Sequence, residues 1–175
     1  MAKINVYFNG KNYSIDEGAL ADARVALESA FETLASSGTL AAGLYVDGVM
    51  TKSCDELISD GIIRINGGRV STNLEETPDG NSNGSSPLLV GYLVLPNDNT
   101  ITMITSFGYC KNLTGIEIPN SVTQILSEAF RNCTSLTEIV FNGTTAQWSA
   151  INKGSLLNYL SPVTHVRCID GDVAL

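Results

Sequence analysis

A repeat of 23 residues in the second half of the chain is the feature that most restricts how this sequence can fold. When the chain is aligned with itself at that offset, Leu93 matches Ile116, and Ile116 matches Ile139. The other matched sets are Leu95/Ile118/Phe141, Pro96/Pro119, Phe107/Phe130, Cys110/Cys133, Leu113/Leu136 and Thr114/Thr137. A fixed period of this length is typical of solenoids, because one unit cannot bury its apolar edge alone and must stack on a neighbour.

Each unit divides into a short strand, a stop and a helical turn. Residues 116–118 alternate as a strand with two side chains inward and one outward, and Pro119-Asn120 ends that strand. Residues 127–132 then form a short helical turn whose Phe130 fills the core. The unit at 93–115 departs from this pattern, because its inward isoleucines come two places later and its helical turn is shorter. We expect roughly two full coils plus end caps.

The segment 118–139 resembles the BspA-type leucine-rich repeat. It reads Ile-Pro-Asn-Ser-Val-Thr-Gln-Ile-Leu-Ser-Glu-Ala-Phe-Arg-Asn-Cys-Thr-Ser-Leu-Thr-Glu-Ile. The stretch from Phe141 to Gly154, with Trp148, is similar to the segment that often closes such arrays, so we expect Trp148 to cover the last coil. The resemblance covers about residues 92–170. It implies adhesion or binding without catalysis, and it transfers no ligand-contact residues.

The outward positions of the repeated strands are the candidate partner-contact face. They are Val94, Glu117, Val140 and Arg167. Two exposed valines beside a glutamate would form a small, partly apolar patch of the kind that marks interaction sites. An ordinary solvated sheet face is the alternative interpretation.

The front of the chain predicts a β-hairpin over residues 4–15. Asn9-Gly10 is a strong two-residue turn signal, because both positions favour positive φ. With that turn, Val6 lies opposite Tyr13 and Ile4 lies opposite Ile15.

One long helix is expected after this hairpin. The Ser14–Glu17 sequence has capping-box spacing, and Leu20, Leu27 and Leu34 recur every seven residues up to about Ala35. We favour a helix lying on its own hairpin over a short coiled-coil seam, because fewer than three heptads are present.

The hairpin-and-helix pattern repeats weakly up to residue 70. Asp47-Gly48 predicts a second hairpin turn, Ser53–Glu56 a second capping box, and Asn66–Arg69 a third tight turn. The acidic pairs at both helix starts are interpreted as charges that complement the helix dipole rather than as catalytic carboxylates. We therefore expect an α+β N-terminal domain, 1–70, built from β-hairpins and one long helix and serving as an anchoring domain.

A linker and a repeat domain complete the predicted organisation. Residues 71–91 are rich in Gly, Ser and Asn and predict a flexible linker, and residues 92–175 predict a leucine-rich-repeat solenoid with a C-terminal cap. The N-terminal end of that solenoid, at Leu93 and Leu95, has no evident cap in this division. Because the linker's composition argues against a rigid fold-back, we expect an oligomer or a component of a larger assembly.

Composition and motifs exclude several functions. The net charge of −8 argues against nucleic acid as a partner, and no apolar run has the length of a membrane span. Phosphate-binding, zinc-protease and acyl-transfer motifs are absent, and His165 is the single histidine. We predict no enzyme activity, no cofactor and no metal. Cys110 and Cys133 are interpreted as stacked buried residues rather than as a disulfide or a metal site.

Two functions fit these features. The first is a bacteriophage virion surface component, such as a capsid decoration, head fibre or tail-associated protein. Its N-terminal domain would bind virion proteins, and its repeat would project outward to a host or environmental surface. The second is a bacterial cell-surface or secreted adhesin. The first is favoured because the N-terminus lacks a recognisable export signal, so we expect the protein on virions made in a host cytoplasm.

Overall fold

The computed structural model describes residues 3–8, 11–16, 40–72 and 88–175. Two short helices lie in these ranges, α2 (Cys54–Ser59) and α3 (Thr145–Ala150). The strands are β1 (Lys3–Phe8), β2 (Lys11–Asp16), β3 (Gly43–Val46), β4 (Val49–Ser53), β5 (Ile63–Asn66), β6 (Arg69–Thr72), β7 (Gly91–Val94), β8 (Met103–Ser106), β9 (Leu113–Ile118), β10 (Gln124–Ile125), β11 (Glu138–Phe141), β12 (Asn152–Lys153), β13 (His165–Cys168) and β14 (Gly171–Ala174).

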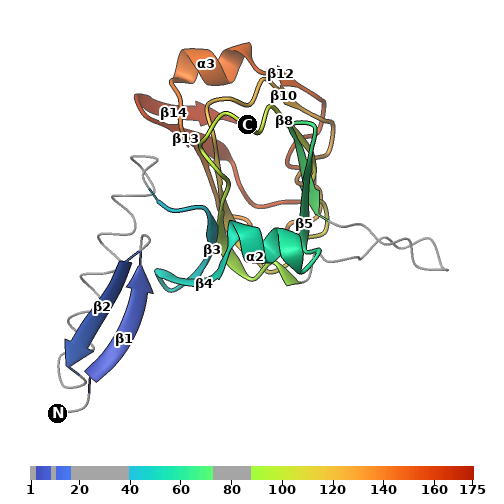
Figure 1. Ribbon diagram of the computed structural model, residues 1–175. Helices are drawn as coiled ribbons and strands as arrows, with labels where there is room; N and C mark the ends of the chain where they lie inside the picture. Colours follow the sequence, from blue (N-terminus) through green and yellow to red (C-terminus); the bar gives the residue numbers. More distant parts are fainter. Residues whose placement is uncertain (1–2, 9–10, 17–39, 73–87) are drawn as a thin grey trace.

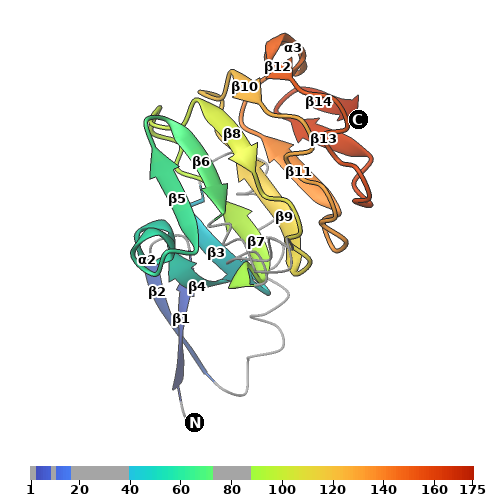
Figure 2. The same ribbon diagram turned by 90° about the vertical axis from the view of Figure 1, so that its right-hand side faces the viewer.

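The repeat folds as a short solenoid of about three turns over residues 91–167. Every turn contributes one strand to each of two facing sheets (Figures 1 and 2). The seven-stranded sheet has the order β14-β13-β11-β9-β7-β3-β4, and the five-stranded sheet has the order β12-β10-β8-β6-β5. Strands of successive turns pair in parallel, because each turn follows the same path as the turn before it.

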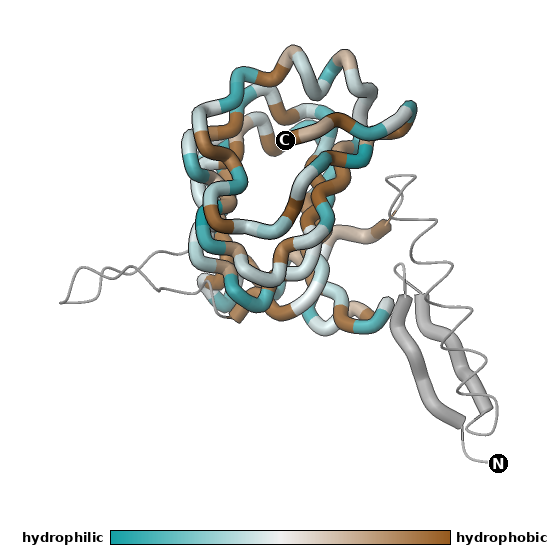
Figure 3. Tube along the Cα trace, turned by 180° about the vertical axis from the view of Figure 1, so that it is seen from behind, coloured by the Kyte–Doolittle hydropathy of each residue, from teal (hydrophilic) through white to brown (hydrophobic). Residues whose placement is uncertain are grey.

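The strand register confirms the 23-residue alignment. Ile116 on β9 lies between Leu93 on β7 and Ile139 on β11, and Ile118 lies beside Phe141. Apolar segments recur along the successive turns of the chain (Figure 3). The matched sequence positions are therefore matched positions in space.

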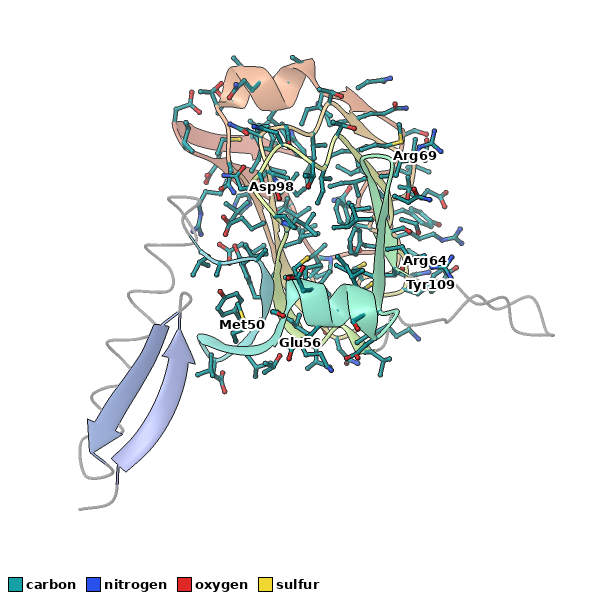
Figure 4. All side chains as sticks on the ribbon, viewed as in Figure 1. Met50, Glu56, Arg64, Arg69, Asp98 and Tyr109 are labelled. Atoms are coloured by element: carbon teal, nitrogen blue, oxygen red, sulfur yellow. The ribbon has the colours of Figure 1, made fainter. Side chains whose placement is uncertain are left out.

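The core fills the space between the two sheets (Figure 4). Phe107, Phe130, Leu113 and Leu136 are all fully buried there, and the rings of Phe107 and Phe130 stack. Cys110 and Cys133 are both buried in the same core. Their interpretation as stacked buried residues is confirmed.

The N-terminal end of the solenoid is closed by residues 40–72. Asp47 and Gly48 take positive φ between β3 and β4, as the hairpin prediction requires, and Gly67 and Gly68 do the same between β5 and β6. Helix α2 begins at Ser53 with the predicted capping box: the Ser53 side chain accepts from the Glu56 amide, and the Glu56 carboxylate accepts from the Ser53 amide.

This arrangement corrects the predicted division at 71–91. Strand β3 pairs antiparallel with β7, and β6 pairs in parallel with β8, so residues 43–72 continue the two sheets of the repeat. Leu57 and Val70 lie in one core with Leu93 and Ile104. The end of the solenoid expected to be open is covered by the chain itself, and the argument for an oligomer that rested on this open end is wrong.

The first hairpin has the predicted register. Strands β1 and β2 are antiparallel, with Val6 opposite Tyr13 and Ile4 opposite Ile15. Strand β2 runs to Asp16, so no helix begins at Ser14. The body of the expected long helix lies outside the described residues, as do the Asn9-Gly10 turn and residues 73–87 of the expected linker.

The C-terminal end is covered by α3 and by the hairpin β13–β14. Trp148 on α3 is buried, and its ring meets Phe141 edge-on at 5.4 Å, which confirms its predicted role as an end cap. Lys153 lies over the same ring and donates from Nζ to the carbonyl oxygens of Trp148 and Ile151. Burial lowers the pKa of this lysine, and the two carbonyls compensate its charge, so Lys153 belongs to the cap.

Candidate binding surface

The four residues predicted to form a contact face do lie in one row. Val94, Glu117, Val140 and Arg167 are neighbours on β7, β9, β11 and β13, on the outer side of the seven-stranded sheet. Their exposure is not as predicted, because Val94, Glu117 and Val140 are buried and only Arg167 is half-exposed. The first three therefore cannot contact a partner in this conformation.

A second apolar cluster accounts for the burial of the valines. Val94 and Val140 pack with Leu40, Tyr45 and Tyr92, and Met50 packs against the same cluster. The Tyr92 ring lies directly over Gly115, where a Cβ atom would come within 2.4 Å of it. The sequence analysis treated the outer strand positions as solvated and did not foresee that aromatic side chains from β3 and β7 would lie on this side.

The turn side of the solenoid presents a different surface. Here the chain passes from the five-stranded sheet back to the seven-stranded sheet, and successive turns are joined by backbone hydrogen bonds. The Tyr109 amide donates to the Arg131 carbonyl at 2.7 Å, and the Asn132 amide donates to the Tyr159 carbonyl at 2.9 Å. These bonds fix the side chains of three successive turns in a column.

Arg131 stands between two tyrosines in that column. Its guanidinium carbon lies 5.7 Å from the ring centroid of Tyr109 and 5.7 Å from that of Tyr159. Its Nη1 also donates to the Glu128 carboxylate at 2.9 Å. Cation–π contacts with two rings and a carboxylate partner together hold this long side chain in one position at the surface.

Exposed leucines flank this column. Leu156 and Leu160 are 58% and 59% exposed, and Tyr159 is 42% exposed. Leu156 and Leu160 have φ of 54° and 58°, a left-handed conformation that costs a branched residue energy. We call Tyr109, Arg131, Leu156, Tyr159 and Leu160 the turn face. Sequence reasoning missed it because the third turn is longer than 23 residues, although the apolar run at 156–160 was a visible signal.

The described residues offer little chemistry for catalysis or metal binding. No group of three or more His, Cys, Asp or Glu side chains within them could hold a metal ion. His165 is exposed beside Thr164, 3.9 Å from Asp172. None of the helices that the structure describes is long and apolar enough to cross a membrane.

Parallel strands in register, a core of stacked apolar residues and caps at both ends define a leucine-rich-repeat solenoid. Residues 91–165 match the family model described as "BspA type Leucine rich repeat region (6 copies)", so this segment is similar to the BspA-type leucine-rich repeat. No curated protein and no solved structure matches the chain. This repeat family is generally non-enzymatic, and its members suggest a binding or adhesin-like role.

Proposed function

We propose that this chain is a non-catalytic binding protein that contacts a protein partner through the turn face. The observation that carries the proposal is the placement of Arg131 between Tyr109 and Tyr159, with Leu156 and Leu160 exposed beside them. Tyrosine and arginine are the residue types most enriched among those that dominate binding energy at protein interfaces.

The backbone of the turn face is already ordered in the absence of a partner. The hydrogen bonds between turns already order the chain, so a partner would not have to immobilise it. Leu156 and Leu160 hold their exposed side chains at left-handed backbone positions that recur at Glu128 and Asn132 in the turn before, so the winding of the solenoid sets where these side chains lie.

Site-specific crosslinking tests the proposal. A photoreactive phenylalanine analogue would replace Tyr159 in the full chain, and a second version would carry it at Ile58, which is 40% exposed on α2. After irradiation in the cells or lysate where the protein is made, we expect a discrete adduct from position 159 alone. The adduct should disappear when Leu160→Asp is added. Identical adducts from both positions, or none from position 159, would contradict the proposal.

A more specific proposal concerns the place where this binding occurs. We propose a bacteriophage virion surface, with the segment before residue 40 bound to virion proteins and the repeat facing outward. Support comes from the resemblance to the BspA-type repeat, which occurs in phage as well as bacterial surface proteins. A bacterial surface adhesin is the alternative. Antibody labelling of purified particles distinguishes the two, because an adhesin would label intact cells and leave particles unlabelled.

A further inference from the structure

Glu117 and Asn142 form a buried polar pair on the outer side of the seven-stranded sheet. Glu117 is fully buried and Asn142 is 8% exposed. Asn142 follows β11 directly, diagonal to Glu117 on β9, and its Nδ2 donates to Glu117 Oε1 at 2.8 Å. A buried carboxyl in an otherwise apolar and aromatic cluster is costly unless its polar atoms are satisfied.

Each member of the pair has one polar atom left over. Glu117 Oε2 and Asn142 Oδ1 are both buried, and neither has a hydrogen-bond partner. If Glu117 is ionised, both atoms are acceptors, and neither can satisfy the other. If Glu117 is protonated, its Oε2–H becomes a donor, and the Asn142 amide oxygen is an unpartnered acceptor on the residue that already donates to Oε1.

We propose that Glu117 is a protonated acid in the folded protein, paired with Asn142 by two reciprocal hydrogen bonds. The amide nitrogen donates to Oε1, and the carboxylic acid Oε2–H donates to Oδ1. At a pH between the unfolded and the folded pKa of this carboxyl, folding then takes up a proton from solvent, because the carboxyl is ionised in the unfolded chain. The pair acts as a device that makes the outer layer of the sheet more stable as the solution becomes more acidic.

The surrounding charges agree with a neutral Glu117. Burial and the nearby Glu138 carboxylate raise the pKa of Glu117 to about 7, against the lowering effect of its bond to Asn142. The other titratable groups on this side among the described residues include Tyr45 on β3, Tyr92 on β7, His165 and Arg167 on β13 and Asp172 on β14. Burial and Glu117 raise the pKa of Tyr92, so it stays neutral. Arg167 is engaged by Glu138 at 3.1 Å.

The direction of the pH effect follows from these values. The folded pKa of Glu117 lies above the usual value of 4.5, so the folded state holds more protons than the unfolded state between those two limits. Its contribution to stability is fully present below the unfolded pKa and is lost as pH rises through about 7. A surface carboxylate in an ion pair would act in the opposite direction.

A glutamine substitution is the sharpest test. Glu117→Gln keeps the shape and supplies both hydrogen bonds permanently, since its amide nitrogen donates to Asn142 Oδ1 and its oxygen accepts from Nδ2. We expect the wild-type melting temperature of the full chain to fall between pH 5 and pH 8, and the Glu117→Gln variant to lose that fall and to melt at least as high as wild type at pH 8. Glu128→Gln makes the same change at a half-exposed carboxylate and should keep the wild-type slope.

A second measurement keeps the proposal testable if the variant folds poorly. The side-chain carboxyl carbon of Glu117 can be followed by NMR in the wild-type protein, assigned by its loss in Glu117→Gln or by through-bond correlation. Titration near neutral pH supports the protonated pair. Titration in the ordinary glutamate range, or a Glu117→Gln variant that keeps the wild-type pH slope, would overturn it.

Discussion

The rings of Phe107 and Phe130 lie parallel to within 22°, with centroids 6.1 Å apart, although 23 residues separate them in the chain. Each ring occupies the same position in its own turn, and each ring packs against the other. Phe130→Ala should therefore lower the free energy of unfolding by about 3–5 kcal/mol, the usual cost of such a truncation in a core. Chemical denaturation measures this. Tyr159→Ala, at an exposed ring, should cost much less, and equal losses would contradict the stacking model.

Two glycines provide a matched test of backbone geometry. Gly67 has φ of 58° with open space where a Cβ would lie, so Gly67→Ala should cost only the left-handed penalty of about 1–2 kcal/mol. Gly91 has φ of 105°, and its Cβ would lie 2.1 Å from the Tyr45 carbonyl oxygen on the neighbouring strand. Gly91→Ala should be clearly more destabilising in thermal melts. If the two variants melt alike, the close approach of β7 to β3 is wrong.

The four thiols should be unreactive in the folded protein. All four are buried, and burial raises the pKa of Cys54 to about 11, so this thiol is not ionised at neutral pH. We expect slow reaction with a thiol reagent in buffer, complete reaction of all four in denaturant, and a melting temperature unchanged by added reductant. A large drop in melting temperature with reductant alone would show that a disulfide contributes to stability.

The cap formed by residues 40–72 should be required for folding. Without it, the edges of β7 and β8 and the apolar residues Leu93 and Ile104 lose their cover. A fragment of residues 88–175 should aggregate or melt without cooperativity, whereas a fragment of residues 40–175 should melt cooperatively. Circular dichroism and light scattering distinguish these outcomes. A soluble, cooperative monomer from the shorter fragment would show that the repeat needs no cap.

The sequence predicted the repeat well because stacking forces equivalent residues into equivalent places. Ile116 had to lie beside Leu93 once the period was known, and the hairpin turns at Asp47-Gly48 and Gly67-Gly68 were evident from their need for positive φ. Such local signals do not say which strands join which sheet. Strands β3 and β7 pair although a polar stretch of sequence separates them. That polar stretch was interpreted as a domain boundary.

The candidate site was less predictable for a related reason. Strand alternation correctly placed Val94 and Glu117 on the outer side of the sheet, but alternation cannot say whether a second layer of side chains lies there. The turn face depends on residues such as Leu160 in the left-handed backbone conformation. Leucine seldom adopts this conformation, and no local sequence pattern predicts it.

The two ends of the seven-stranded sheet finish in antiparallel hairpins, β3–β4 at one end and β13–β14 at the other, while every pairing between successive repeat turns is parallel. Strand β14 at the C-terminal end runs against the repeat strands, whereas β4 at the other end runs with them, because β4 is antiparallel to β3 and β3 is antiparallel to β7. Both edge strands belong to the end caps and not to repeat turns, so the number of coils is fixed by the number of repeats in the sequence. Duplicating the 23 residues from Ile116 to Glu138 would lengthen the rod by one coil and leave both ends as they are.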